Sequence, residues 1–316
     1  MDNRKVVIIG DGMVGSTIAY TLMMKDYVNE IVIIDIVKEK VEGDVLDMMH
    51  GVSFVSPKLI KAGTYEDIKD AHIVIITAGV AQKQGETRLD LLKRNIKIFD
   101  SILDQVKPHL EPDALILVVS NPVDVLSYYT YKKLQIEPSR VIGSGTVLDS
   151  SRLRFLISEE ADVDPRNVHS YVIGEHGDSE VSAFSVANIG QIPLKEYLIN
   201  TKGPKGIEIL KTLHEKVKNA AYEIIQKKGA TYYAIGLATS KIVGTILNNT
   251  RSILTVSTYV ENEFNGEIDG VYISLPCVVG NKGVIERLHL EYSYDEVLKL
   301  IQSANTLKTT YRDLNI

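Results

Sequence analysis

The chain has 316 residues and a formal net charge of −6, with 45% hydrophobic and 24% charged residues. This composition is ordinary for a globular protein of one large or two domains, and it offers no basic excess for binding nucleic acid or an anionic membrane. No window reaches the roughly 18 apolar residues of a membrane span. The single cysteine, Cys277, excludes an intrachain disulfide, and its apolar neighbours indicate a buried core residue. We therefore expect a soluble cytoplasmic protein without nucleic-acid or membrane partners.

The first half of the chain alternates short β-branched runs with segments of helical spacing. The expected strands are Lys5–Ile9, Ile31–Asp35, His72–Thr77 and Leu115–Val119, and the expected helices are Met13–Lys25, Lys38–His50 and Arg88–Leu110. Alternating strands and helices indicate an α/β fold with a parallel sheet, because parallel neighbours need crossover connections that place helices on both faces.

The second half has a different pattern. The expected elements are a strand at Asn167–Ile173, long helices at Gly206–Lys227 and Tyr232–Asn249, antiparallel strands at Ile253–Val260 and Val271–Ile273, and a closing helix at Leu298–Arg312. The pattern changes near Ile142–Thr146. We therefore predict two domains, residues 1–143 and residues 144–316, the second of α+β type.

A glycine-rich turn joins the first strand to the first helix. In its GxGxxG pattern, Gly10 gives a tight bend, Gly12 lets a pyrophosphate approach the backbone, and Gly15 lets the helix pack close to the strand. Asp35 ends the second strand 20 residues after Gly15, where a carboxylate can accept both ribose hydroxyls of NAD and repel the 2′-phosphate of NADP. This context predicts a Rossmann-type, doubly wound NAD-binding domain. The alternative is a helix-packing glycine cluster with an unrelated acid at the strand end.

Several polar segments could carry chemistry. His176 lies in the glycine-flanked segment Gly174–Asp178, just past a strand, which leaves its imidazole accessible. Asn121-Pro122 closes a strand at the carboxyl edge of the sheet, where open α/β sheets bind ligands. The segment Thr146–Arg152 precedes a helical run, and Arg88 follows a polar segment suited to a mobile loop. A single histidine is weak evidence for a catalytic site. The other polar segments make a catalytic role of His176 a stronger prediction.

Taken in order, these motifs resemble the L-lactate dehydrogenase branch of the lactate/malate dehydrogenase family over essentially the whole chain. The matching motifs are the glycine turn at 10–15, Gly85-Glu86-Thr87-Arg88, Ser120-Asn121-Pro122-Val123-Asp124, Leu148-Asp149-Ser150-Ser151-Arg152 and Ile173-Gly174-Glu175-His176-Gly177-Asp178. The resemblance implies an NAD-dependent enzyme that interconverts pyruvate and L-lactate and assembles as a homotetramer. We expect no metal site.

The resemblance also implies a role for each catalytic residue. His176 would donate a proton to the carbonyl oxygen of a 2-oxo acid, since an imidazole titrates near working pH, and Asp149 would bond its other ring nitrogen. Asp149 could also cap the helix that follows. Arg152 would grip the substrate carboxylate through a two-pronged pair. Closure of a loop would bring Arg88 to the substrate, where it would stabilise negative charge on the carbonyl oxygen. Asn121 would donate a hydrogen bond to the same oxygen.

Other residues would line the substrate and cofactor pockets. Thr231 and Ile235 would line the substrate side-chain and nicotinamide pockets, although a threonine near a helix start is also commonly a cap. The full set of cofactor-binding residues implied by the resemblance is Gly10, Gly12, Met13, Val14, Gly15, Asp35, Thr77, Ala78, Gly79, Asn121 and Ile235.

Gln82 distinguishes between substrates. Family members that use oxaloacetate carry an arginine at the matching position, whereas glutamine offers neutral dipoles alone. Enclosing a second carboxylate without a counter-charge costs on the order of several kcal/mol, so we expect pyruvate to be preferred. Lys83 offers another positive charge nearby, and larger 2-oxo acids stay open. The alternatives are a malate dehydrogenase, an L-2-hydroxyisocaproate-type dehydrogenase and a non-catalytic NAD-binding module, which the intact catalytic set disfavours.

Two further basic residues suggest regulation. Arg152 and Arg154 stand two apart in a predicted helix, about 200° around its axis, so Arg154 should face away from the substrate. In related bacterial lactate dehydrogenases, the matching arginine and a histidine seven residues before the catalytic one bind fructose 1,6-bisphosphate between subunits. That histidine is His169 here. The resemblance therefore implies activation by this sugar bisphosphate, and the alternative is a surface ion pair and a strand-edge histidine.

Overall fold

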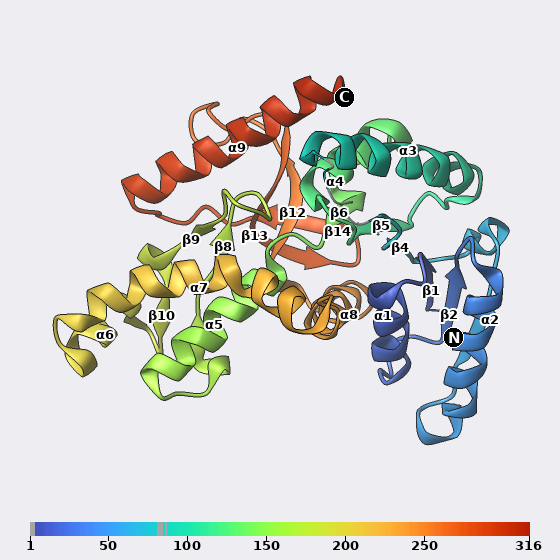
Figure 1. The fold of residues 1–316 in the computed structure, drawn as a ribbon, viewed down its shortest axis with the longest axis horizontal. Coiled ribbons are helices and arrows are strands. Elements are labelled where there is room, and N and C mark those ends of the chain that lie inside the picture. The colour runs from blue at the N-terminus through green and yellow to red at the C-terminus, as the bar shows by residue number, and fades with distance from the viewer. Residues whose placement is uncertain (1–3, 81–84, 86) are drawn as a thin grey trace.

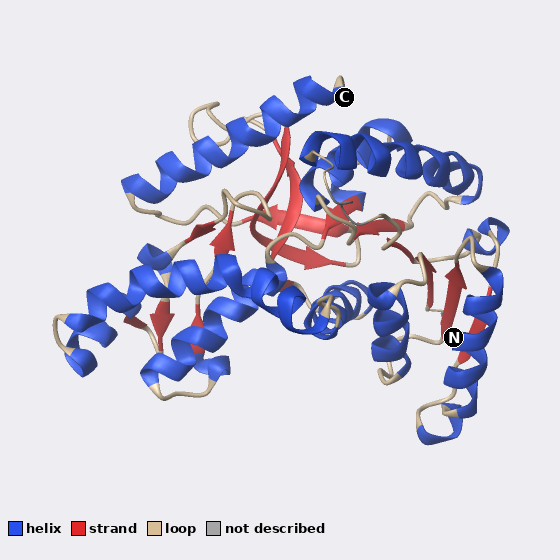
Figure 2. Cartoon of the chain, in the orientation of Figure 1, coloured by secondary structure: helices blue, strands red, loops and turns tan. Residues whose placement is uncertain are grey.

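The computed structural model describes residues 4–80, 85 and 87–316. A long central sheet carries helices on both faces, and a smaller group of helices and short strands lies at one end of it (Figure 1, Figure 2). Within the described residues, no helix is both long and apolar enough to cross a membrane.

The central sheet of the described chain has nine strands in the order β14-β13-β12-β6-β5-β4-β1-β2-β3. Its parallel part consists of β1 (Lys5–Ile9), β2 (Glu30–Ile34), β3 (Leu59–Ala62), β4 (Ile73–Ile76), β5 (Leu115–Val118) and β6 (Val141–Gly143). Strands β1, β2, β4 and β5 are buried along their whole length, as parallel strands between two helical layers must be. The predicted α/β fold with a Rossmann-type parallel sheet is confirmed, although the sequence analysis missed β3 and β6.

Antiparallel strands from the second half extend this sheet. They are β12 (Ser252–Val260), β13 (Val271–Gly280) and β14 (Gly283–Arg287). Gly143 of β6 pairs in parallel with Val118 of β5 and antiparallel with Ser257 of β12. The sheet therefore changes from parallel to antiparallel pairing at β6. The predicted domain boundary after residue 143 coincides with this change and stays a prediction.

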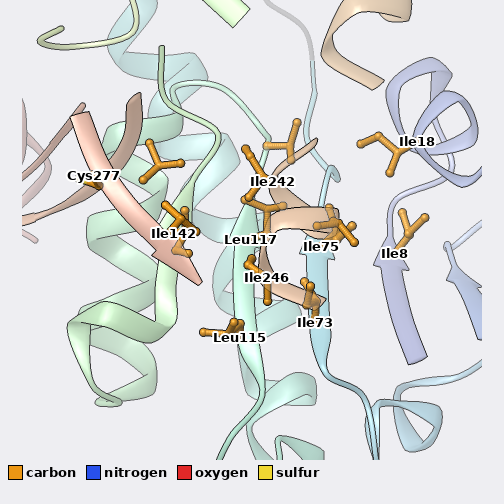
Figure 3. Close-up of a cluster of buried hydrophobic side chains, with 14 of the residues drawn as sticks. Ile8, Ile18, Ile73, Ile75, Leu115, Leu117, Ile142, Ile242, Ile246 and Cys277 are labelled. Atoms are coloured by element: carbon orange, nitrogen blue, oxygen red, sulfur yellow. The ribbon is translucent and has the colours of Figure 1, made fainter. Parts of the chain in front are cut away.

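Helices cover both faces of the central sheet, and α6 and α7 lie apart from it over a smaller sheet. The helices are α1 (Met13–Met23), α2 (Lys38–His50), α3 (Arg88–Val106), α4 (Val123–Leu134), α5 (Val147–Ala161), α6 (Leu194–Lys202), α7 (Lys205–Lys228), α8 (Tyr233–Leu247) and α9 (Tyr294–Leu314). Residues of β1 alternate between two hydrophobic cores, one on each face. In the first core, Ile242 and Ile246 of α8 pack with Leu117 of β5 (Figure 3). A helix from the second half therefore covers the sheet of the first half.

Short strands and turns complete the second half. Strand β7 (Val168–His169) pairs with β10 (Asn188–Ile189), which pairs with β11 (Ile192–Pro193), while β8 (Val172–Ile173) pairs with β9 (Val181–Ser182). Residues of α5, α6 and α7 form a third core over the first of these small sheets. The 3-10 helices are Val52–Phe54, Tyr65–Ile68, Lys107–His109, Pro138–Arg140, Pro165–Asn167 and Phe184–Val186.

Four predicted elements differ clearly from the structure. The strand expected at Val271–Ile273 continues to Gly280. The single strand Asn167–Ile173 is wrong, because the chain changes its pairing partner between β7 and β8. The helix expected to reach Leu110 ends at Val106, since Pro108 lacks an N–H and sits in a 3-10 turn. The closing helix begins at Tyr294 rather than Leu298, because Ser293 and Glu296 form a capping box.

Candidate active site

The glycine turn lies between β1 and the N-terminus of α1. Gly10 has a φ of +107°, and a Cβ on Gly15 would stand 1.9 Å from the carbonyl oxygen of Gly10, so both positions require glycine. A Cβ on Gly12 would meet no described atom within 4 Å. No described side chain caps α1 at this glycine, so its first-turn N–H groups face this opening. Met13, which is exposed, and Val14 begin the helix there.

Asp35 follows β2 and holds the glycine turn. Its Oδ2 accepts a 2.7 Å hydrogen bond from the backbone nitrogen of Asp11, and its Oδ1 accepts one of 2.9 Å from Val37. A carboxylate offers about four lone-pair positions, so these bonds leave acceptor capacity for two hydroxyl groups. Lys40 of α2 braces the same turn through a 3.0 Å contact with the buried Asp11 carboxylate. Asp35 is therefore fixed in place and can still accept hydrogen bonds.

The ends of β4 and β5 form the neighbouring edge of the site. Thr77 donates from its Oγ1 to the carbonyl oxygen of Gly10 at 2.8 Å, and Ser120 donates to that of Ala78 at 2.6 Å. Gly79 is exposed just beyond, as is Asn121 after β5. Thr77 and Ala78 therefore lie against Gly10 of the glycine turn, and Gly79 lies next to Asn95 and Ser120. Their roles in cofactor binding stay predictions.

The pair formed by His176 and Asp149 joins the loop between β8 and β9 to α5. Nδ1 of His176 lies 2.6 Å from Oδ2 of Asp149, and Nη1 of Arg152 donates to Oδ1 of Asp149 at 2.7 Å. The Asp149 side chain is 3% exposed and the His176 side chain 25%. Asp149 stands in the first turn of α5, where the helix dipole favours a negative charge. Three predicted site residues therefore meet through a single carboxylate.

This geometry controls the protonation of His176. Burial alone lowers the pKa of the imidazole, but the charge and hydrogen bond of Asp149 outweigh it and raise the pKa to about 9. His176 and Arg152 in turn hold the pKa of Asp149 below its usual range, although burial opposes this. At neutral pH, His176 is therefore an imidazolium that can donate a proton.

Asp124 positions the backbone of the catalytic loop. It lies in the first turn of α4, is 1% exposed, and accepts a 2.8 Å hydrogen bond from the backbone nitrogen of His176 and one of 2.6 Å from Ser257 Oγ. Burial raises the pKa of this carboxyl to about 7. The sequence analysis quoted Asp124 within a motif but gave it no role. The available signal in the sequence was its position three residues after Asn121, close to the strand end at which the site was predicted.

Asn95 is a second residue that the sequence analysis missed. Its buried side chain accepts from the backbone nitrogen of Val80 at 3.0 Å and donates to the carbonyl oxygen of Asn121 at 3.2 Å, which ties the ends of β4 and β5 together. Asn95 lies four residues before Phe99 on the apolar side of α3. A polar residue within an apolar helix stripe was the signal for a buried hydrogen-bonding role.

The first turn of helix α8 packs against α1, the helix that follows the glycine turn. A Cβ on Gly236 would come within 2.7 Å of Thr17, so α8 packs closely on α1, which Figure 1 also shows. Ile235 packs against the first core, and Thr231 lies half-buried just before the helix. The roles of Ile235 at the cofactor and of Thr231 at the substrate stay predictions.

The remaining predicted residues have mixed outcomes. Gln82 and Lys83 lie outside the described residues. Arg88 begins α3, and Thr87 caps this helix by accepting from the backbone nitrogen of Asp90 at 3.2 Å, but the Arg88 side chain lies outside the description. Cys277 is buried, as expected.

Arg154 contacts the segment before β8, whereas Arg152 contacts Asp149. It donates from its Nε to the carbonyl oxygen of Ser170 at 3.3 Å and lies 5.8 Å from the ring of Tyr171. The exposed His169 precedes Ser170 on β7. The structure therefore places Arg154 against the segment that carries His169.

Comparison with known proteins agrees with this site. Residues 4–143 match the model of the lactate/malate dehydrogenase NAD binding domain, and residues 146–314 match that of the family's alpha/beta C-terminal domain. An L-lactate dehydrogenase of Clostridium botulinum is 50% identical over 98% of this chain and 96% of its own length.

Two crystal structures are also similar. One is a lactate dehydrogenase enzyme from a Medee basin deep-sea metagenome library, with 44% identity, a TM-score of 0.94 and full coverage of both chains. The other is the ligand-bound minor L-lactate dehydrogenase of Enterococcus mundtii, with 42% identity and a TM-score of 0.94 over 99% of this chain and 98% of that one.

The chain belongs to the lactate/malate dehydrogenase family. It is an NAD-dependent oxidoreductase of 2-hydroxy acids. The residues fit the cofactor, because the open space at Gly12, the uncapped N-terminus of α1 and the spare acceptor capacity of Asp35 are the features that a pyrophosphate and a ribose need.

Proposed function

We propose that the protein is an L-lactate dehydrogenase that reduces pyruvate to L-lactate in fermentation. The hydrogen-bonded pair of His176 and Asp149, with Arg152 on the same carboxylate, carries this proposal. It combines a proton donor with a carboxylate-binding guanidinium at the carboxyl edge of a nucleotide-binding sheet. The relatives named L-lactate dehydrogenase support the same activity.

Each residue has a task in this reaction. NADH, when bound, supplies the hydride to the carbonyl carbon. His176 donates a proton from Nε2 to the carbonyl oxygen, while Asp149 holds Nδ1 and stabilises the imidazolium. Arg152 binds the substrate carboxylate, because its bond to Asp149 uses one of the five guanidinium N–H donors and leaves others for a two-pronged pair. In the lactate-forming direction, His176 ends the step as a neutral imidazole.

Residues on the loop and near α8 complete the proposed site. Arg88 stabilises charge on the carbonyl oxygen when the loop closes, and Asn121 hydrogen-bonds the same oxygen. Gln82 leaves the pocket without a counter-charge for a second carboxylate, which favours pyruvate over oxaloacetate. Thr231 lines the pocket for the substrate methyl group.

We assign cofactor binding to residues 1–143 and substrate binding mainly to residues 144–316. The cofactor contacts are the glycine turn with Met13 and Val14, then Asp35, Thr77–Gly79, Asn121 and Ile235. The last of these comes from the second half, which the packing of α8 on α1 supports.

We further propose that fructose 1,6-bisphosphate activates the enzyme at Arg154 and His169, in a homotetramer. Arg154 supports this, because it lines a cavity of about 280 Å³ together with Lys241 and Tyr171, while His169 lies outside that lining on the adjoining segment. Two basic side chains around one cavity suit an anionic ligand. The cytoplasmic location expected from the sequence stays a prediction.

Parallel assays with pyruvate, oxaloacetate and 2-oxoisocaproate test the proposed function through the loss of NADH absorbance. We expect pyruvate to give the highest kcat/KM. An equal kcat/KM for oxaloacetate would indicate a malate dehydrogenase, and a higher value for 2-oxoisocaproate would indicate a hydroxyisocaproate-type enzyme. No oxidation of NADH with any 2-oxo acid would leave a non-catalytic NAD-binding module.

A further inference from the structure

A third carboxyl group lies beside the catalytic pair. Glu180 directly precedes β9, and its backbone nitrogen donates to the carbonyl oxygen of Gly177 at 3.2 Å, which turns the chain back toward His176. A ring nitrogen of His176 and carboxylate oxygens of Asp149 and Glu180 all lie within 4.8 Å of one another. The residue Glu180 is 7% exposed. The loop between β8 and β9 therefore supplies two ionisable groups to one buried cluster.

Glu180 differs from the other buried acids of this region in its hydrogen bonding. Asp124 accepts from His176 and Ser257, and Glu296 accepts from the backbone nitrogen of Ser185 and caps α9. The Oε1 atom of Glu180 is buried and has no hydrogen-bond partner in the described part of the chain. A buried carboxyl oxygen without a partner destabilises the fold. Its position is therefore not explained by local structure.

The charges around Glu180 come from three elements. His176 lies on its own loop, Asp149 and Arg152 belong to α5, and Lys218 approaches from α7. Asp124 of α4 faces His176 as well. Burial, assisted by Asp149, raises the pKa of Glu180 to about 8, while His176, Arg152 and Lys218 oppose the rise. Glu180 therefore changes its charge in the same pH range in which His176 works.

We propose that Glu180 is a positioning residue whose carboxylate charge keeps the proton on His176 at alkaline pH. When Glu180 ionises, a negative charge appears within 4.8 Å of the imidazolium and favours the protonated ring. Glu180 gives no proton to the substrate, because His176 alone makes that transfer. The inference rests on the proposed function in one respect, namely that proton donation by His176 limits pyruvate reduction at high pH.

The test compares Glu180→Gln with the wild-type enzyme in the pH dependence of kcat/KM for pyruvate. Glutamine reproduces the shape of a protonated carboxyl but not its ionised form. We expect the alkaline limb to move to lower pH by about one to two units, with a loss of activity that grows above about pH 8. Glu180→Asp restores the charge on a shorter side chain and should recover part of the shift.

A matched control separates a local effect from a change in net charge. Glu223→Gln removes one negative charge from the exposed side of α7, where Glu223 pairs with Lys227. We expect this variant to keep the wild-type alkaline limb. An equal shift in both variants would overturn the assignment to Glu180.

A direct titration of His176 makes the test independent of the substrate. In histidine-labelled enzyme without substrate, the imidazole resonance of His176 is assigned by its loss in His176→Asn and followed by NMR against pH. We expect its midpoint to fall in Glu180→Gln by about the same one to two units. An unchanged midpoint, in a variant whose NADH affinity is retained, would overturn the inference. Failure of the wild-type enzyme to reduce pyruvate would instead overturn the proposed function and leave this titration valid.

Discussion

The backbone nitrogen of His176 donates a hydrogen bond of 2.8 Å to the buried carboxylate of Asp124. The contact links the loop between β8 and β9 to the first turn of α4, directly after Asn121 at the end of β5. The position of the imidazole therefore depends on a side chain that never touches it. Ser257 of β12 supports the same carboxylate from a third element.

Asp124→Ala should therefore lower kcat for pyruvate reduction by about tenfold or more. Alanine removes both acceptor oxygens, so the backbone nitrogen of His176 loses its bond, and a loop displacement of this kind costs catalysis more than binding. Steady-state kinetics with saturating NADH measure the effect. Ser257→Ala is the control, since it leaves the bond to His176 intact and should lower kcat much less. Equal losses in both variants would argue against a specific role of the His176 contact.

Removal of the Asp149 carboxylate should shift the pH profile. The wild-type pKa of His176 is raised to about 9, so the imidazolium needed for pyruvate reduction persists at neutral pH and is lost as the pH rises through 9. Lactate oxidation needs the neutral ring and should increase over the same interval. In Asp149→Asn, the alkaline limb should move toward pH 6.5 and kcat should fall by about 100-fold or more. Rate profiles in both directions from pH 5 to pH 10 test this, and an unmoved limb would contradict it.

Asp35→Ser should weaken NADH binding and relax the choice of cofactor. The substitution removes the proposed acceptor for the ribose hydroxyls and the two bonds that Asp35 accepts from the backbone nitrogens of Asp11 and Val37. We expect the Kd for NADH to rise by about tenfold or more, and the preference for NADH over NADPH to shrink. Fluorescence titrations with both cofactors measure the change. Lys40→Gln, which loosens Asp11 without touching Asp35, should weaken both cofactors equally.

Gln82→Arg should shift the substrate preference toward oxaloacetate. An arginine would supply the counter-charge that a second carboxylate requires when the site closes. We expect the ratio of kcat/KM for oxaloacetate to that for pyruvate to rise by about 100-fold or more. Lys83→Gln is the control, because it tests whether the neighbouring ammonium already supplies such a charge. No change of the ratio in Gln82→Arg would remove Gln82 from the substrate pocket.

The sequence predicted those parts of the structure that depend on local pattern. The apolar strands β1, β2, β4 and β5 and the glycine turn are local signals, and the structure contains all of them. The strand β6 was missed because it is short and takes its stability from β5 and β12 on either side. The break between β7 and β8 was missed because both pieces carry β-branched residues, and tertiary pairing alone separates them.

The candidate site shows the same division. His176, Asp149 and Arg152 were predicted through motifs, and their meeting at one carboxylate follows from the packing of α5 against β8. The roles of Asp124 and Asn95 depend on hydrogen bonds to backbone atoms far away in the sequence. Such bonds leave little trace in a single sequence beyond a polar residue at a buried position. Glu180, whose proposed role depends on its charge, is likewise visible in the sequence only as an acidic residue at a position that the fold buries.

Arg154→Gln should abolish the response to fructose 1,6-bisphosphate. The two phosphates need fixed cations, and Arg154 is held at the segment before Tyr171 by its bond to Ser170, next to His169. In the parent enzyme we expect the sugar bisphosphate to lower the KM for pyruvate or to stabilise the tetramer, which activity titrations and sedimentation measure. Arg166→Gln is the matched control, since this exposed arginine pairs with Asp164 and should leave the response intact. A flat response in the parent enzyme would make Arg154 a structural residue that braces β7 and β8.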